Sequence, residues 1–231
     1  MTLKKQYDQI RNELDEWCRQ LGRNPDEVML VSVSKTVGLD TIAEAIAAGI
    51  EVFGENRPDA LLEKQQMYPH ATWHFIGNIQ SRRIGDIVSA ADLIHSVYKV
   101  GHLSLINKEA CKRGKVQNIL LEVNISGEQA KGGISPNEVD DFITQAETLD
   151  YVCVRGLMTM APQGNEDTAR QCFADLAQLR RRIIEEHNTV EKIQYLNELS
   201  MGMSEDWHEA VSEGATMVRI GRAIFDESFD R

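Results

Sequence analysis

Short apolar runs alternate with helical patterns along most of the chain, and this alternation restricts the possible folds more than any other feature. The runs predict eight strands, at residues 29–35, 51–56, 72–77, 93–97, 118–125, 152–159, 195–200 and 216–221. Between them lie stretches of helical periodicity, several of which end in glycine, the usual C-terminal cap. Strands that alternate with helices pair in parallel through crossover connections. Eight of them predict a closed (β/α)8 TIM barrel; an open doubly wound sheet is the alternative.

An amphipathic helix is predicted before the first strand, at about residues 2–21. Its apolar residues recur at steps of three and four and form one stripe, made of Leu3, Tyr7, Ile10, Leu14, Trp17 and Leu21. Gly22 and Pro25 follow it and end the helical pattern. Because no Pro-, Gly- or Ser-rich linker divides the chain, we expect a single domain over residues 1–231, with this helix packed on the barrel.

The charge balance excludes two classes of partner. The chain of 231 residues has a formal net charge of −11, from 36 acidic and 25 basic residues. Nucleic acids and anionic membranes bind surfaces with clustered Lys and Arg. We therefore expect no nucleic-acid or membrane partner, and a small molecule or another protein instead.

The cysteines and the N-terminal segment indicate the compartment. The four cysteines, Cys18, Cys111, Cys153 and Cys172, are far apart and form no C-x-x-C pair, which is typical of free thiols in a reducing compartment. The N-terminal residues lack the apolar region of a signal peptide, and no segment is long and apolar enough to span a membrane. These features predict a cytoplasmic protein.

Two glycine-containing segments follow the last two predicted strands. In a TIM barrel, functional groups lie at the carboxyl ends of the strands, and phosphate often binds after strands 7 and 8. The segment 200-SMGMSED-206 contains Ser200 and Gly202, and Ser204 is predicted to cap a helix there. The segment 219-RIGRAIF-225 contains Gly221. Either glycine alone is typical of a turn; together they predict a phosphate site.

Lys35 ends the first predicted strand and has two interpretations. It is either a solvated strand end or an amine held for chemistry. A free lysine has a pKa of about 10.4, so roughly one molecule in a few thousand is neutral at pH 7. A Schiff-base lysine must therefore be desolvated or lie near another cation. Arg219, on the last strand, is next to the first strand once the barrel closes. Lys35 beside a phosphate site suggests pyridoxal 5′-phosphate (PLP).

Several motifs in order resemble one known family. They are VSVSKT, FGEN, WHFIGNIQS, EVNIS with KGGI, RGLMTM, LSMGMSED and MVRIGRAIF. Together they resemble the YggS-like, or PROSC, family of PLP homeostasis proteins from about residue 28 to residue 225. The resemblance implies a single alanine-racemase-like barrel that carries PLP without an established catalytic reaction.

The resemblance also implies which residues hold PLP: Lys35, Asn56, Ser200, Gly202, Arg219, Gly221 and Arg222. Lys35 would form the internal aldimine. Ser200, Gly202, Gly221 and Arg222 would hold the phosphate. Arg219 would face the pyridine nitrogen, and Asn56 would line the cofactor. The chain departs from the family at 57–58 and 78–79, and at position 222, where Arg222 replaces a common threonine.

A binding and delivery protein is favoured over an enzyme. An arginine does not protonate the pyridine nitrogen, so the ring would be a weak electron sink. Alanine racemases take an acid/base group from a second domain, which we expect to be absent after the eighth strand. We expect a monomer that delivers PLP to PLP-dependent apo-enzymes. Lys131 in the loop 127–134 is predicted to contact cofactor or incoming ligand.

Three alternatives remain from the residues. The first is a PLP-dependent amino-acid racemase of weak activity. The second is a metal-dependent barrel hydrolase that would recruit His74 and His95, although the six histidines have no ligand-like spacing and His74 is interpreted as a satisfied strand residue. The third is a Schiff-base aldolase that uses a barrel lysine. No metal site is predicted.

Overall fold

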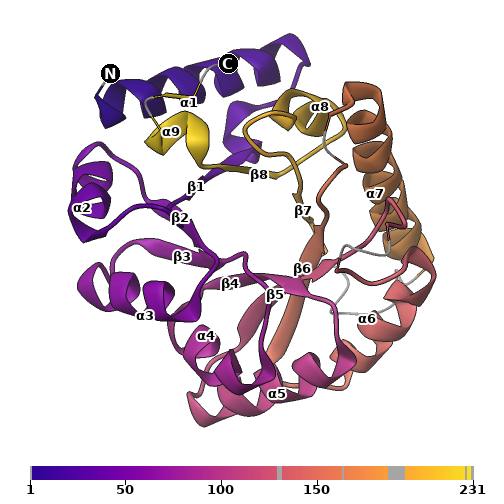
Figure 1. The fold of residues 1–231 in the computed structure, drawn as a ribbon. Helices are drawn as coiled ribbons and strands as arrows, with labels where there is room; N and C mark the ends of the chain where they lie inside the picture. The colour runs from indigo at the N-terminus through magenta and orange to yellow at the C-terminus, as the bar shows by residue number, and fades with distance from the viewer. Residues whose placement is uncertain (1, 129–131, 163, 187–195, 227, 230–231) are drawn as a thin grey trace.

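The strands form a closed barrel in which each strand is parallel to both neighbours, in the order β1 to β8. The computed structural model describes residues 2–128, 132–162, 164–186, 196–226 and 228–229. Figure 1 looks into the ring of strands. The strands are β1 (Met29–Val33), β2 (Val52–Glu55), β3 (Thr72–Phe75), β4 (Leu93–Val97), β5 (Gln117–Glu122), β6 (Val152–Met158), β7 (Glu198–Ser200) and β8 (Met217–Ile220). The predicted TIM barrel is confirmed, and the open doubly wound alternative is wrong.

Helices surround the barrel on its outer side (Figure 1). They are α1 (Leu3–Gln20), α2 (Leu39–Ala47), α3 (Pro58–Met67), α4 (Ile84–Ala90), α5 (Val100–Lys112), α6 (Val139–Glu147), α7 (Glu166–Glu186), α8 (Trp207–Ser212) and α9 (Arg222–Phe225). Short 3-10 turns lie at Pro25–Glu27, Ser81–Arg83 and Pro136–Glu138. Within the part of the chain that the structure describes, no helix is long and apolar enough to cross a membrane.

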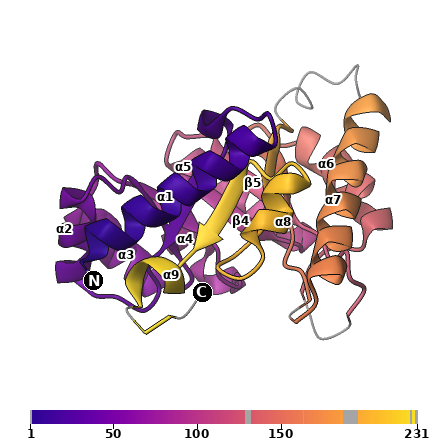
Figure 2. The ribbon, with the colours of Figure 1, turned by 90° about the horizontal axis from the view of Figure 1, so that it is seen from above.

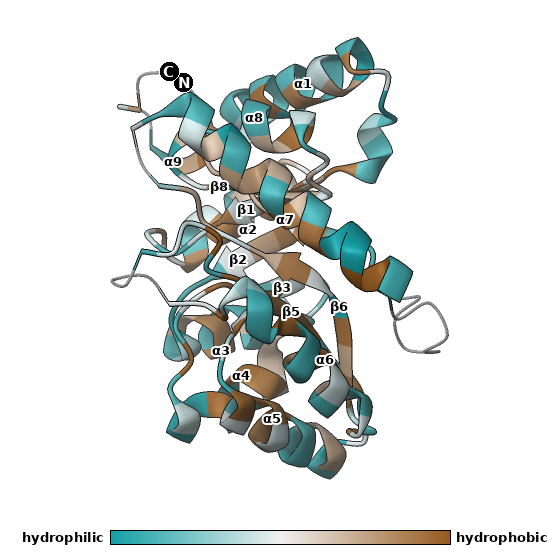
Figure 3. Ribbon diagram, turned by 90° about the vertical axis from the view of Figure 1, so that its right-hand side faces the viewer, coloured by the Kyte–Doolittle hydropathy of each residue, from teal (hydrophilic) through white to brown (hydrophobic). Residues whose placement is uncertain are grey.

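The core has two parts. A small cluster fills the inside of the barrel and consists of Val31, Leu93, Leu120, Met158 and Met217. A larger one fills the layer between the strands and the helices, where the rings of Phe53 and Trp73 stack at 5.0 Å. In Figure 3 the central strands are mostly brown or pale, and teal residues recur along the surrounding helices. Apolar side chains on both faces are the reason that the strands read as nearly continuous apolar runs.

Helix α1 confirms the predicted N-terminal helix and covers the seam between β1 and β8. Thr2 caps its first turn, since the side chain accepts from the Lys5 amide. In Figure 2 it runs alongside α9 and reaches α8. Trp17 Nε1 donates to the carbonyl oxygen of His208 at 3.1 Å. The helix therefore contacts the elements that follow both β7 and β8.

Two predicted boundaries are wrong near the predicted site. The first strand ends at Val33 rather than at residue 35, because Val37 N–H donates to Ser34 O at 3.2 Å and closes a turn. Lys35 is therefore the second residue of a four-residue turn. Helix α8 begins at Trp207, so Ser204 does not cap it. The seventh strand is described only from Glu198, and residue 195 lies outside the described residues.

Candidate functional site

The predicted cofactor residues lie in or just after four consecutive strands of the closed barrel, β7, β8, β1 and β2. Lys35 follows β1, Ser200 ends β7, and Arg219 lies in β8. Because β1 pairs with β8, with Val31 beside Arg219, the beginning and end of the barrel meet here. Asn56 is exposed and follows β2, the neighbour of β1 on the other side. The closure of the barrel thus brings together segments that are far apart in the sequence.

Arg219 is a buried cation with fixed partners. Its side chain is 5% exposed. Nη1 donates to Ser200 Oγ at 2.7 Å, and Nη2 donates to Thr159 O at 3.1 Å. Burial lowers the pKa of Arg219 to about 10, against the opposing effect of the Asp206 and Glu122 carboxylates. Arg219 is therefore protonated at neutral pH and remains a hydrogen-bond donor.

A chain of hydrogen bonds runs from Arg219 across the barrel. Ser200 Oγ accepts from Arg219, so its own proton is free to donate to His95 Nδ1, 2.9 Å away. His95 Nε2 then carries the proton that it donates to His74 Nδ1 at 3.0 Å. These bonds assign one tautomer to His95. The interpretation of His74 as a satisfied strand residue is confirmed.

Burial keeps both imidazoles neutral at pH 7. It lowers the pKa of His74 to about 4. It lowers the pKa of His95 well below the ordinary value, and the nearby His74 and Arg219 act in the same direction. Among the described residues, no group of three or more His, Cys, Asp and Glu side chains is arranged to hold a metal ion.

The histidine chain changes the expectation for Ser200. The Ser200 side chain is completely buried, and its hydroxyl contacts Arg219 and His95. Its role toward phosphate stays a prediction. Sequence reasoning missed the contact between His95 and Ser200. The signal was the alternation in 93-LIHSV-97, which places His95 on the same face as Leu93, a residue of the inner cluster.

Two glycines lie where a β-carbon would be crowded, Gly202 severely and Gly221 less so. Gly202 has a φ of +90°, and a β-carbon there would lie 2.6 Å from Ala210 Cβ. At Gly221 a β-carbon would lie 3.1 Å from Val33 O on the neighbouring strand. The loop after β7 is also joined to β8, because Arg219 N–H donates to Gly202 O at 2.9 Å. Glycine is needed at position 202 for packing and backbone conformation, whatever binds there.

The rim of the site carries opposite charges. Arg222 is exposed, and Nη2 donates to Glu205 Oε1 at 2.6 Å. Asp206 accepts from the Met203 amide at 2.5 Å. Burial raises the pKa of Asp206, and it raises that of Glu122 as well. Lys131, predicted to contact cofactor or ligand, lies outside the described residues.

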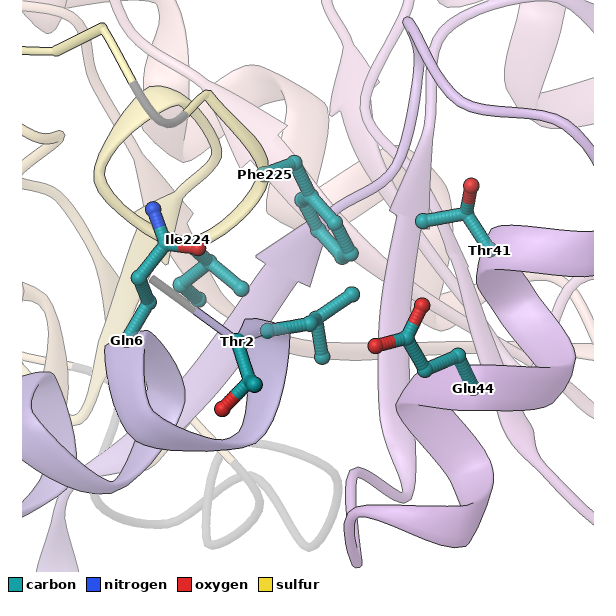
Figure 4. A pocket seen from close by; sticks show the side chains of 7 residues that line it. Thr2, Gln6, Thr41, Glu44, Ile224 and Phe225 are labelled. Carbon is teal, nitrogen blue, oxygen red and sulfur yellow. The ribbon is translucent and has the colours of Figure 1, made fainter.

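A pocket of about 570 Å³ lies elsewhere, between α1, α2 and α9 (Figure 4). The lining residues are Thr2, Leu3, Gln6, Thr41, Glu44, Ile224 and Phe225. None of the predicted cofactor residues lines this pocket. We therefore place the candidate site by its chemistry, and not by this pocket.

Known proteins resemble the whole chain. The family model described as alanine racemase, N-terminal domain, matches residues 6–228. The pyridoxal phosphate homeostasis protein of Aquifex aeolicus is 35% identical over 230 residues, which cover 98% of this chain and 99% of the relative. This chain belongs to the pyridoxal phosphate homeostasis protein family. The member from Escherichia coli strain K12 is 32% identical over 227 residues, 94% of this chain and 93% of the relative. The resemblance seen in the motifs is thereby confirmed.

Solved structures agree with the family. PipY of Synechococcus elongatus, solved with PLP bound, has a TM-score of 0.85 and 31% identity, and the match covers 97% of this chain and all of that one. The alanine racemase of Clostridium difficile has a TM-score of 0.69 at 14% identity, over 93% of this chain and 55% of that one. That second likeness shows the fold alone.

Proposed function

We propose that this chain binds PLP at the carboxyl ends of β7, β8 and β1, holds it through a Schiff base on Lys35, and serves intracellular PLP homeostasis. Its relatives with full-length matches are named pyridoxal phosphate homeostasis proteins. The similar PipY has been solved with PLP.

The β1–β8 pairing is the observation that carries the proposal. It joins the strand that precedes Lys35 to the strand that contains Arg219 and precedes Gly221. An amine, a buried guanidinium and a backbone without a β-carbon therefore come from two adjacent strands. These groups suit an aldehyde, a pyridine ring and a phosphate respectively.

The donor set fits PLP at the level of residue chemistry. When bound, PLP supplies an aldehyde that condenses with amines and a ring that withdraws electrons. Lys35 is exposed at the barrel end, so its amine is accessible to the aldehyde. Arg222 adds an exposed guanidinium beside Gly221. At Gly202 and Gly221 the space of a β-carbon is taken by Ala210 and Val33, so the backbone N–H groups of these two loops would hold the phosphate.

We further propose that the site binds and releases PLP without catalysing turnover. Arg219 is protonated and donates hydrogen bonds, so beside the ring nitrogen it would favour the neutral ring and would not supply a proton as a carboxylic acid would. A ring that stays neutral withdraws fewer electrons from a bound amino acid. Weak racemase activity is the alternative, and an assay with L- and D-alanine separates the two.

The remaining expectations concern partners, oligomeric state and compartment. We propose a cytoplasmic monomer that delivers PLP to apo-enzymes. The four cysteines are free, as expected in a reducing compartment. Part of the apolar stripe of α1 is used within the chain, since Leu3, Ile10 and Leu14 are buried. Sedimentation of the purified protein and PLP transfer to an apo-enzyme test the oligomeric state and the delivery.

The decisive experiment maps the covalent adduct. Purified protein is mixed with PLP, its absorption spectrum is recorded, and borohydride reduction is followed by peptide mass mapping. Lys35→Ala is compared with Lys99→Ala, which removes an exposed lysine just beyond β4 at the same end of the barrel. We expect a pyridoxyl group on Lys35 in the wild type and in Lys99→Ala, and its loss in Lys35→Ala. Adducts scattered over surface lysines would refute the proposal.

A further inference from the structure

Three buried polar side chains lie directly behind the turn that contains Lys35. Ser34 and Glu55 are completely buried, and Lys64 is 3% exposed. They come from the ends of β1 and β2 and from α3, which packs on the outer side of β2 and β3 (Figure 1). Buried Lys and Glu are rare unless they are paired, and neither residue belongs to the predicted cofactor set.

Every polar group of Ser34 is engaged. Its N–H donates to Gly54 O at 3.0 Å, and its hydroxyl donates to Glu55 Oε1 at 2.6 Å. Its carbonyl oxygen accepts from Lys64 Nζ at 2.8 Å. The same carbonyl accepts from Val37 N–H at 3.2 Å and closes the turn. One ammonium group therefore binds the oxygen that defines the turn containing Lys35.

The ammonium group is itself held by a buried partner. Lys64 Nζ contacts Glu55 Oε1 at 2.5 Å, while Glu55 Oε2 is buried with no hydrogen-bond partner among the described residues. Buried ion pairs add little net stability, but removal of one partner leaves an uncompensated charge. Their better-supported role is to fix one arrangement among several. Here the arrangement is the position of α3 relative to the ends of β1 and β2.

We propose that Lys64 and Glu55 are positioning residues for Lys35. Together they fix the Ser34–Val37 turn, so that the Lys35 amine is presented at the barrel end in one orientation without loss of its solvent access. This inference rests on the proposed function, because a fixed Lys35 matters for PLP only if Lys35 binds it. It deepens that function by naming the residues that would hold Lys35 in place. The two residues act through Ser34 and do not contact the cofactor.

The first arm of the test needs no cofactor. Amide hydrogen exchange at Val37 is compared by NMR in the wild type, in Lys64→Met and in Leu103→Ala. The last variant opens a cavity at a fully buried position of α5 and is a control for general loss of stability. In Lys64→Met we expect the Val37 amide to exchange about tenfold faster than the variant's loss of global stability accounts for. Leu103→Ala should show no such excess.

The second arm measures PLP. Reduction and mapping, together with the release rate of PLP into excess apo-enzyme, should show less Lys35 adduct and about tenfold faster release in Lys64→Met. If this variant does not fold, Lys64→Met/Glu55→Gln removes both charges and retains the acceptor for Ser34. A folded variant with wild-type exchange at Val37 and wild-type PLP release would overturn the inference. Absence of any Lys35 adduct in the wild type would instead refute the proposed function, and the exchange arm would still decide whether Lys64 holds the turn.

Discussion

Replacement of Gly202 by alanine should destabilise the protein more than the same replacement at Gly214. Both glycines have positive φ, +90° and +95°, so both alanines carry backbone strain of roughly 1–2 kcal/mol. A β-carbon at Gly214 meets only open space among the described residues, whereas at Gly202 it would lie 2.6 Å from Ala210 Cβ and 3.1 Å from Trp207 Cα. That overlap adds roughly 1–3 kcal/mol.

The expected free energies of unfolding follow from these values. Gly202→Ala should lose about 2–5 kcal/mol, and Gly214→Ala about 1–2 kcal/mol. The smaller entropy of an unfolded chain with alanine is common to both variants and cancels in their comparison. For a chain of this size, the larger loss corresponds to a Tm lower by roughly 4–20 °C. Urea unfolding with a shared m-value measures the difference.

Equal losses at the two positions would refute the reasoning. In that case the α8 backbone would move away from the new methyl group at little cost, and the close packing at Gly202 would not be a constraint. Because Gly202 O accepts from the Arg219 amide, the same variant should also weaken PLP binding. Gly214→Ala, at the far end of α8, should bind PLP as the wild type does.

Three further predictions concern Lys35, His74 and Arg222. Lys35→Ala should change the free energy of unfolding by less than about 0.5 kcal/mol in urea titrations, because its side chain is exposed; a larger loss would show a structural role. The pKa of His74 is about 4 in the folded protein and near 6.5 in the unfolded chain. The folded state therefore has its full stability above pH 6.5. It loses roughly 3 kcal/mol of that stability as the pH falls from 6.5 toward 4, because only the unfolded chain binds the proton in this range. The stability difference between the wild type and His74→Gln should therefore narrow from pH 7.5 to pH 5, and a constant difference would contradict the assignment. Arg222→Ala should cost less than about 1 kcal/mol, with a smaller cost in 1 M salt, because its ion pair with Glu205 is more than half exposed; a loss above about 2 kcal/mol would contradict a surface role.

The strands could be located from the sequence because apolar runs end at polar or glycine residues. The prediction at 93–97 matches β4 as the structure has it. The predicted first strand is two residues too long, because the alternation continues through Val33 to Lys35 while the hydrogen bonds that define β1 end at Val33. Whether Ser34 continues a strand or begins a turn depends on partners in β2 and α3. Those partners are known only once the elements are packed.

The same limit applies to the site. Closure of the barrel makes β1 and β8 neighbours. The sequence therefore predicts that Lys35, after β1, and Arg219, in β8, come from adjacent strands. The role of Lys64 was not predictable, because a lysine in 57-RPDALLEKQQ-66 is normally interpreted as solvated. A weak signal existed: Lys64 lies three residues after the buried Leu61 and therefore on the same helical face. Such lysines usually extend along the apolar surface to reach water, and only the buried Glu55 explains the exception.

The closure of the barrel has a consequence for the order of events during synthesis. Met29 in β1 pairs with Met217 in β8. One edge of β1, the first strand to be synthesised, therefore stays unpaired until β8 has been synthesised. Until then β1 is an open edge, which is a template for incorrect pairing. The Lys35 amine and the Arg219 guanidinium come from opposite sides of that seam. A ribosome-bound chain that lacks β8 can therefore present the lysine but not the guanidinium, and the proposed PLP site is complete only after β8 has joined β1.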